Sequence, residues 1–251
     1  MALSCRQPMV QHMNSDSTIR TAASVLLLVL AGCSNDLTLP SNSGSGLGLS
    51  QVRGDGQRGT VGAPLPAPLV VRVVSSGGAG VSGRRVAFLP IGEGSADRLE
   101  PDTALTNSSG EASSTWVLGP QAGQQQVEAR LVVDDTVPEP VTFSAEAVAA
   151  APDTLAGASA LNRAGRRGAE VADPLVVRVA DRFGNPVSGA VVTWEVTAGG
   201  GELSLQASET SADGTTAVSW HLGDQVGIQR ATAAISGVTG SPVTFSAVVL
   251  F

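Results

Sequence analysis

Few side chains in this sequence have the chemistry that catalysis or metal binding requires. His221 is the only histidine after residue 12, the chain has no lysine, and its cysteines are Cys5 and Cys33. If Trp220 points into a core, the alternation of a β-strand turns His221 outward, away from any buried nucleophile. Zinc sites need several Cys or His ligands, and a P-loop needs a lysine. We therefore predict no enzymatic activity, no cofactor, no metal and no small-molecule substrate.

Carboxylates and glycines offer weaker signals of a functional site. The adjacent acids Asp134-Asp135 point apart in any strand or loop, which favours a solvated turn. Residues 199–201 are Gly-Gly-Gly, which we interpret as a turn and not as a phosphate-binding loop. For Asp181 and Asp213, the alternative to a structural role in turns is a calcium site. It is less favoured because the sequence lacks the ligand-dense loop that is typical of calcium sites.

The tripeptide Arg53-Gly54-Asp55 has the Arg-Gly-Asp sequence of integrin ligands. It lies in a glycine-rich stretch that we expect to be exposed near the first strand. Because glycine and arginine are frequent in this chain, such a triplet arises readily by chance. We interpret it as a chance occurrence, and cell attachment through Asp55 is the alternative.

The charge of the chain argues against a nucleic-acid partner. The formal net charge is −7, with 15 basic residues, all of them arginine, against 22 acids. The longest basic clusters are the pairs Arg84-Arg85 and Arg166-Arg167. These pairs are too small to follow a phosphate backbone, so nucleic acid is excluded as a partner.

The N-terminal segment has the pattern of an export signal. Residues 22–31 form a short apolar run that Arg20 precedes and a polar segment follows. Ten helical residues cover about 15 Å, roughly half of a membrane's hydrocarbon core, so a stable transmembrane helix is not expected. The stretch before Arg20 is long for a signal, which leaves the start of translation open between Met1 and Met13.

Leu30, Ala31, Gly32 and Cys33 resemble the lipobox of bacterial lipoproteins. The resemblance implies that Cys33 becomes the first residue of the mature chain and carries acyl groups, which hold the protein at a membrane. The implied location is the bacterial cell envelope, on either the periplasmic or the surface side. The alternative is an ordinary signal peptide followed by an incidental cysteine.

The chain beyond Cys33 divides into a tether and two domains. The residues after Cys33 are rich in Ser, Asn and Gly, and such a segment cannot bury enough apolar surface to order itself. The predicted layout is a signal peptide over 1–32, a lipidated cysteine and flexible tether over 33–46, a first domain over 47–150 and a second over 151–251.

The two domains are copies of one another. PLVVRV at 68–73 recurs at 174–179, and PVTFSA at 140–145 recurs at 242–247. A period of roughly 100 residues is too long for a solenoid repeat and has the size of one immunoglobulin-like sandwich. The predicted fold class is therefore all-β, with two tandem immunoglobulin-like β-sandwiches.

Period-2 alternation supports strands in both copies. Leu69, Val71 and Val73 fall on one face of such a strand, and Arg72 falls on the other. Large aromatic residues stand at matching positions of the two copies, and we expect them to pack in the cores, with carbohydrate stacking as the alternative. These residues are Phe88, Trp116, Phe143, Trp194, Trp220 and Phe245.

The turns between the predicted strands carry the most specific residues. An Asp side chain can accept hydrogen bonds from nearby backbone N–H groups, and Gly184 allows a positive φ angle. These properties predict tight structural turns at two places in the second copy. The residues are Asp181, Gly184, Asn185 and Pro186 in one turn, and Asp213 and Gly214 in the other.

The same segments make the second copy similar to bacterial Ig-like domain group 1 (Big-1), the repeat of invasin- and intimin-type surface proteins. The resemblance covers essentially all of 153–251. The first copy is degenerate, because Ser75 stands in place of Asp181, and Ala79-Gly80 stands in place of Asn185-Pro186. These changes put the geometry of its turn in question.

Together these features favour a non-enzymatic cell-envelope lipoprotein whose domains act as a structural stalk or adhesion module. The alternative is a module that binds glycans or proteins of a periplasmic or outer-membrane complex. Fold alone does not decide between the two.

Overall fold

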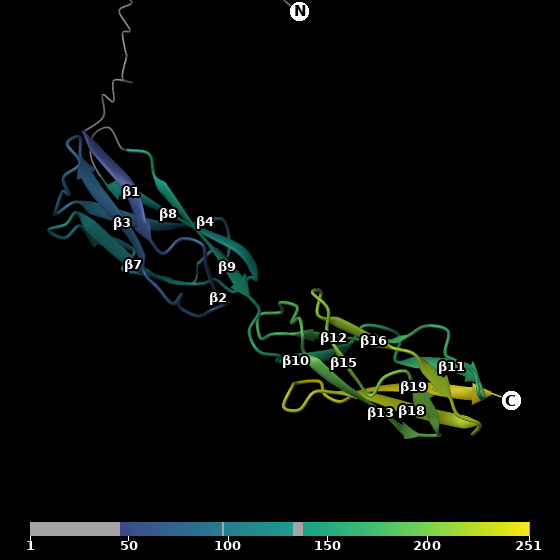
Figure 1. Cartoon of the computed structure of the whole chain (residues 1–251). Coiled ribbons are helices and arrows are strands. Elements are labelled where there is room, and N and C mark those ends of the chain that lie inside the picture. The colour runs from purple at the N-terminus through teal and green to yellow at the C-terminus, as the bar shows by residue number, and fades with distance from the viewer. Residues whose placement is uncertain (1–45, 97, 133–137, 251) are drawn as a thin grey trace, which may run out of the picture. The chain divides into compact units, whose positions relative to one another are not determined.

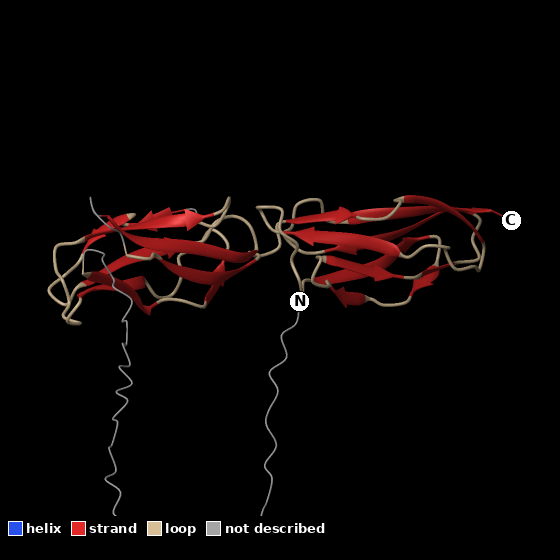
Figure 2. Ribbon diagram, turned by 90° about the horizontal axis from the view of Figure 1, so that it is seen from above, coloured by secondary structure: helices blue, strands red, loops and turns tan. Residues whose placement is uncertain are grey.

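The computed structural model describes residues 46–96, 98–132 and 138–250, and in these ranges the chain consists of strands, turns and loops (Figure 1, Figure 2). No helix in the described ranges is long and apolar enough to cross a membrane. The predicted signal peptide, the lipobox with Cys33, the tether up to residue 45 and the pair Asp134-Asp135 lie outside these ranges. Both sandwiches belong to the same compact unit of the chain, which spans Asn42–Phe251.

The first sandwich is built from two sheets. The smaller sheet has the strand order β1-β3-β7-β5, and the larger sheet has the order β2-β9-β8-β4-β6. All neighbouring strands are antiparallel except β2, which lies parallel to β9. The strands of the smaller sheet are β1 (Leu47–Arg53), β3 (Leu69–Ser75), β7 (Glu111–Val117) and β5 (Arg98–Glu100). Those of the larger sheet are β2 (Gln57–Thr60), β9 (Val141–Val148), β8 (Gly123–Val132), β4 (Arg85–Ile91) and β6 (Thr103–Leu105).

The second sandwich repeats this arrangement. Its larger sheet has the order β11-β19-β18-β13-β15, with β11 parallel to β19, and the opposite layer consists of β10-β12-β16 and the pair β14-β17. The larger sheet contains β11 (Asn162–Arg166), β19 (Val243–Leu250), β18 (Gly227–Ala234), β13 (Val191–Ala198) and β15 (Ala207–Glu209). The opposite layer contains β10 (Thr154–Gly157), β12 (Leu175–Ala180), β16 (Thr215–Val218), β14 (Gly201–Leu203) and β17 (Trp220–Leu222).

Each sandwich has a core of its own, formed by the inward positions of alternating strands. Leu69, Val71 and Val73 of β3 are fully buried, while Arg72 between them is partly exposed. In the second copy Leu175, Val177 and Val179 of β12 are equally buried. This alternation removes the apolar side chains of both sheets from water, which is the main driving force for a sandwich. The predicted fold class, all-β with two tandem immunoglobulin-like sandwiches, is confirmed.

Candidate functional site

The six large aromatic side chains lie in the cores of the two sandwiches. Each is between 0% and 3% exposed, so none presents a ring face on which a sugar could stack. Trp194 and Phe245 stack with ring centroids 6.2 Å apart. The matching positions are Phe88 and Trp194, Trp116 and Trp220, and Phe143 and Phe245. Among the described residues, the exposed aromatic side chain is Phe183, at 40%, with the Arg182 guanidinium 4.6 Å from its ring centre.

The turn between β12 and β13 is organised around the carboxylate of Asp181. Oδ1 of this residue accepts hydrogen bonds from the backbone N–H groups of Phe183 and Asn185, both at 2.9 Å. Gly184 has a φ of 87°, a conformation that glycine adopts without strain. The backbone closes the turn with the bonds Asp181 N to Asn185 O and Gly184 N to Asp181 O.

Asp181 is 2% exposed, and its carboxylate is held in the ionised form by its partners. Burial by itself raises the pKa of Asp181, but the hydrogen bonds from Asn185, Ala150 and Phe183 outweigh it and lower the pKa below the ordinary value of 3.8. A carboxylate that accepts this many hydrogen bonds has few free lone pairs to offer a metal ion.

The second predicted turn is organised by Asp213 in the same way. Oδ1 of Asp213 accepts hydrogen bonds from the hydroxyls of Ser211 and Thr215, at 2.5 and 2.8 Å, and from the backbone N–H of Thr215. The hydrogen bond from Ser211 is the largest of the effects that lower the pKa of Asp213 to about 2. Gly214 has a φ of 75°. Within the described ranges no group of three or more His, Cys, Asp or Glu side chains is placed to hold a metal ion.

The corresponding turn of the first sandwich keeps the same backbone geometry despite its different residues. Ser75 N donates to Ala79 O at 2.9 Å and Gly78 N donates to Ser75 O at 2.8 Å, as Asp181 and Gly184 do in the second copy. Gly78 has a φ of 79°, close to the value for Gly184. The doubt raised about this turn by its sequence was therefore wrong, because the glycine, the backbone bonds and the Ser75 hydroxyl, which donates to Ala79 O at 3.4 Å, form it without Asp or Asn.

The Arg53-Gly54-Asp55 triplet starts at the last residue of β1 and runs into the connection to β2. Oδ1 of Asp55 accepts hydrogen bonds from the backbone N–H and the hydroxyl of Ser144 on β9, at 2.7 and 3.0 Å. A Cβ at Gly54 would lie 2.5 Å from the carbonyl oxygen of Pro68, so the chain passes too closely there for any larger residue. The Asp55 carboxylate therefore has a local structural use, joining the β1–β2 connection to the larger sheet.

His221 lies in β17, between the buried residues Trp220 and Leu222, and its side chain is exposed. It pairs with Glu202 across the β14–β17 ladder, and Glu170 forms a bridge on its other side. The shallow hollow around it is also lined by Ser204 and Ser219. A base that is exposed in this way lacks the buried, oriented setting that nucleophilic catalysis needs.

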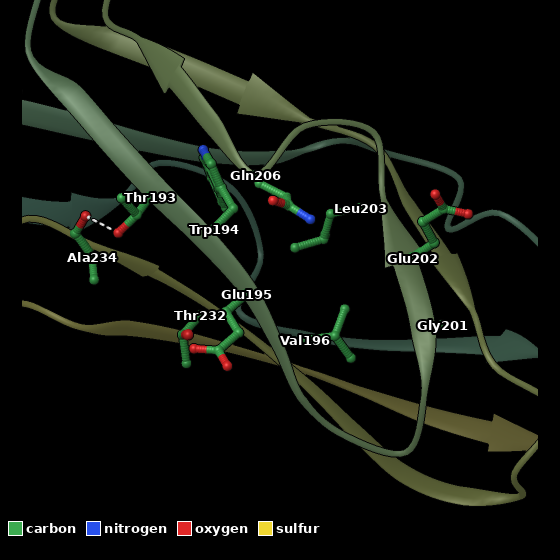
Figure 3. A pocket seen from close by; sticks show the side chains of 10 residues that line it. All are labelled: Thr193, Trp194, Glu195, Val196, Gly201, Glu202, Leu203, Gln206, Thr232 and Ala234. Carbon is green, nitrogen blue, oxygen red and sulfur yellow. Dashed lines mark hydrogen bonds between the residues drawn. The ribbon is translucent and has the colours of Figure 1, made fainter.

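A hollow larger than the one around His221 lies over β13 and β14 and has a volume of about 560 Å³. Figure 3 shows its lining, in which Glu195 lies beside Thr232, and Gln206 lies beside Leu203. The hydroxyl of Thr193 is occupied by a hydrogen bond to the carbonyl oxygen of Ala234. The remaining carboxylate, amide and hydroxyl groups can exchange hydrogen bonds with a polar ligand, but they form no nucleophile–base pair.

Two pairs of buried polar residues hold loops in both copies, and the sequence reasoning did not assign them a role. The side chain of Gln125 accepts from Gly119 N and donates to Gly119 O and Gln121 O, and Gln229 makes the same three bonds in the second copy. The hydroxyl of Thr106 donates to Val81 O and accepts from Arg84 N, just before β4. The hydroxyl of Thr210 makes the matching bonds to Val187 O and Ala190 N, just before β13. Their identity at matching positions of the two repeats was the signal that could have found them.

Several solved structures are similar to this chain in fold. The adhesin FdeC of Escherichia coli is similar over 82% of this chain, with 17% identity and a TM-score of 0.53. This match spans 64% of the FdeC chain, less than two thirds of its length. The D0-D1 domains of intimin match 81% of this chain and 95% of their own at 20% identity, with a TM-score of 0.28.

The bacterial integrin-binding protein invasin matches 81% of this chain and 39% of its own, at 18% identity and a TM-score of 0.36. A scan against protein-family models and a search of curated proteins found no match. Identities of this size show likeness of fold, and the FdeC match is the one of the three whose TM-score exceeds 0.5. The chain therefore has the fold of the immunoglobulin-like domains found in bacterial adhesins.

Proposed function

We propose that this chain is a non-enzymatic cell-envelope lipoprotein whose tandem sandwiches serve as a structural stalk or adhesion module. The observation that carries the proposal is the pair of repeated sandwiches, similar in fold to an Escherichia coli adhesin over 82% of the chain. The candidate reactive residues support it as well. His221 is exposed, and both turn aspartates are engaged by hydrogen bonds to neighbouring groups.

The lipid attachment at Cys33 is tested by fractionation and mass spectrometry of the expressed full chain. We expect the wild-type protein in the membrane fraction, with a mature mass that begins at Cys33 and includes acyl chains. Cys33→Ala is expected to release the protein from membranes, whereas Cys5→Ala, within the predicted signal, leaves it membrane-bound. An unmodified Cys33 in the mature protein would exclude the anchor.

The side of the envelope on which the sandwiches lie is tested by protease treatment of intact cells. Digestion before the outer membrane is permeabilised would support a surface stalk or adhesion module. Resistance until permeabilisation would place the sandwiches in the periplasm and exclude contact with host cells. In the surface case, host-cell attachment by wild-type and Asp55→Glu chains tests the Arg-Gly-Asp alternative, and equal attachment would exclude it.

A second candidate function is the binding of glycans or proteins in an envelope complex. The polar hollow over β13 and β14 favours it, because its carboxylate and amide side chains are the groups that bind sugar hydroxyls. A glycan array probed with the chain and with its Gln206→Ala variant tests this site. Hits lost in the variant would support it, and an array without hits at high protein concentration would count against it.

A further inference from the structure

The β3–β4 turn of the first sandwich and the β12–β13 turn of the second have the same backbone geometry but different side chains. The backbone hydrogen bonds and the positive-φ glycine are the same in both turns. Ser75 and Ala79 therefore suffice where the second copy has Asp181 and Asn185. Because the turn forms without these two side chains, their hydrogen bonds beyond the turn call for a separate explanation.

The carboxylate of Asp181 reaches the linker between the two sandwiches. β9 ends at Val148 and β10 begins at Thr154, which leaves a linker over 149–153. Oδ2 of Asp181 accepts a hydrogen bond of 2.9 Å from the backbone N–H of Ala150 in this linker. Ala150 also packs against the core of the first sandwich. A buried ionised oxygen thus fixes a linker residue that belongs to the first core.

The amide of Asn185 bonds to the loop between β7 and β8 of the first sandwich. Its Nδ2 donates to the carbonyl oxygen of Pro120 at 2.7 Å and to Oδ2 of Asp181 at 3.0 Å. Its Oδ1 accepts from the backbone N–H of Ala122 at 2.9 Å. Both ends of the amide are therefore used, and Asp181 orients the group that makes the two bonds.

An aromatic contact accompanies these hydrogen bonds. A Cβ at Gly62, which follows β2, would lie 2.9 Å from the ring of Phe183 and 3.3 Å from the guanidinium of Arg182. Gly62 also has a positive φ of 68°. The positive φ and the nearby ring therefore favour glycine on the first sandwich where the Asp181–Asn185 turn of the second approaches it.

We infer that Asp181 and Asn185 form a docking site by which the second sandwich holds the linker and the β7–β8 loop of the first. The partner that fits this site is an immunoglobulin-like sandwich that precedes it in the chain. Such a sandwich provides a backbone N–H in the linker for Asp181, and a carbonyl oxygen and a backbone N–H in its β7–β8 loop for Asn185. Ala79 has no side-chain amide, and the hydroxyl of Ser75 donates to Ala79 O within its own turn, so the first sandwich lacks this site. The inference holds whether or not the chain is a lipoprotein or an adhesin.

The backbone N–H of Ala122 is the sharpest probe of this docking site. In the part of the chain that the structure describes, its partner is Asn185 Oδ1. We expect Asn185→Ala in the full chain, studied in detergent by residue-resolved amide exchange, to raise the exchange rate of Ala122 by about tenfold. Asp181→Ser is expected to do the same for Ala150. These substitutions copy Ala79 and Ser75, whose turn is intact, so the variants are expected to fold.

Asp213→Ala is the matched control, because Asp213 also organises a turn of the second sandwich and bonds only within that turn in the described part of the chain. It should leave the exchange of Ala122 and Ala150 unchanged. Unaltered exchange of β12 and β18 amides in every variant verifies that the second core persists. The inference is overturned if Ala122 and Ala150 exchange in the wild-type chain at the rate of unstructured peptide. It is also overturned if Asn185→Ala leaves Ala122 protected while the core amides are unaltered.

Discussion

The two sandwiches share their buried positions and differ on the outer face of the larger sheet. In the first sandwich the cross-strand pair Gln124 and Glu146 lies on this face, and Ile228 and Val248 occupy the matching pair in the second. Ile228 is 55% and Val248 is 47% exposed. The inward neighbours, such as Phe143 and Phe245, are identical in type and fully buried. Duplication has thus kept what packing requires and has left the solvent-facing positions free to diverge.

The comparison also separates two kinds of buried polar group. The indole N–H of Trp116 donates to the carbonyl oxygen of Ser95 at 3.1 Å. The indole nitrogen of Trp220, at the matching position, is buried and has no hydrogen-bond partner among the described residues. Tryptophan therefore occupies the same position in both cores, but within the described ranges its indole N–H is hydrogen-bonded only in the first.

The largest expected effects come from the matching core aromatics. Phe143→Ala and Phe245→Ala each leave a cavity in one core, and each is expected to lower the free energy of unfolding of its own sandwich by about 3–5 kcal/mol. Denaturant titration monitored by tryptophan fluorescence measures both losses, and Leu105→Ala at an exposed position serves as the control. A loss below about 1 kcal/mol in one copy would break the equivalence of the two cores.

The buried glutamines are expected to matter somewhat less. Gln125→Ala or Gln229→Ala removes the partner of Gly119 N or Gly223 N and of two carbonyl oxygens in the same loop. Leaving such groups unpaired costs about 1–3 kcal/mol. Denaturation midpoints should fall to a similar extent in the two copies. Gln126→Ala, at an exposed position of the same strand, should leave the midpoint unchanged.

The two tryptophans sharpen the comparison. Trp116→Phe loses the hydrogen bond to Ser95 O, whereas Trp220→Phe removes an N–H that has no partner in the described structure. We expect Trp116→Phe to be more destabilising by about 1 kcal/mol. Thermal unfolding of the two variants in the same buffer tests this difference. Equal losses would mean that the two indole nitrogens contribute alike.

The second sandwich is expected to be the more acid-sensitive of the two. Asp181 and Asp213 have lowered pKa values, that of Asp213 about 2, and the first copy has Ser75 and Ser109 at these positions. A carboxylate with a depressed folded pKa stabilises the fold above its unfolded value of 3.8 and loses this contribution as the pH falls toward 2.

Amide exchange of β12 and β3, compared at pH 5 and pH 2.5, measures this acid sensitivity for each sandwich in one sample. The opening free energy of β12 should fall more than that of β3. Asp181→Asn should reduce the difference, because the neutral side chain no longer titrates. A larger fall in β3 would contradict the role given to the two carboxylates.

The smallest effect is expected on the outer face of the second sandwich. Ile228→Gln with Val248→Glu gives the second sandwich the polar pair of the first, and surface changes of this kind alter stability by about 0.5 kcal/mol or less. The expected change is a lower tendency to associate at high concentration, since an exposed apolar pair is removed. Light scattering measures the association, and a stability loss of several kcal/mol would show that the pair is part of the core.

Much of the fold follows from local patterns in the sequence. The period-2 alternation around Leu69 and Leu175 is a property of each strand taken alone, and the recurrence of PLVVRV and PVTFSA marks the two copies. The turn glycine at Gly184 was also predictable, because positive φ is a local requirement. The geometry of the first turn was not, because backbone bonds preserve it when the recognisable Asp and Asn are replaced.

The sequence by itself determined that the chain forms two β-sandwiches, because burial on alternate residues and repetition can be read without knowing what lies nearby. Only the tertiary structure decided what Asp181 and Asn185 bind. Their partners are Ala150, 31 residues from Asp181, and Pro120 and Ala122, 65 and 63 residues from Asn185. Backbone N–H and carbonyl groups occur at almost every residue, so the sequence does not indicate which of them a distant side chain will contact.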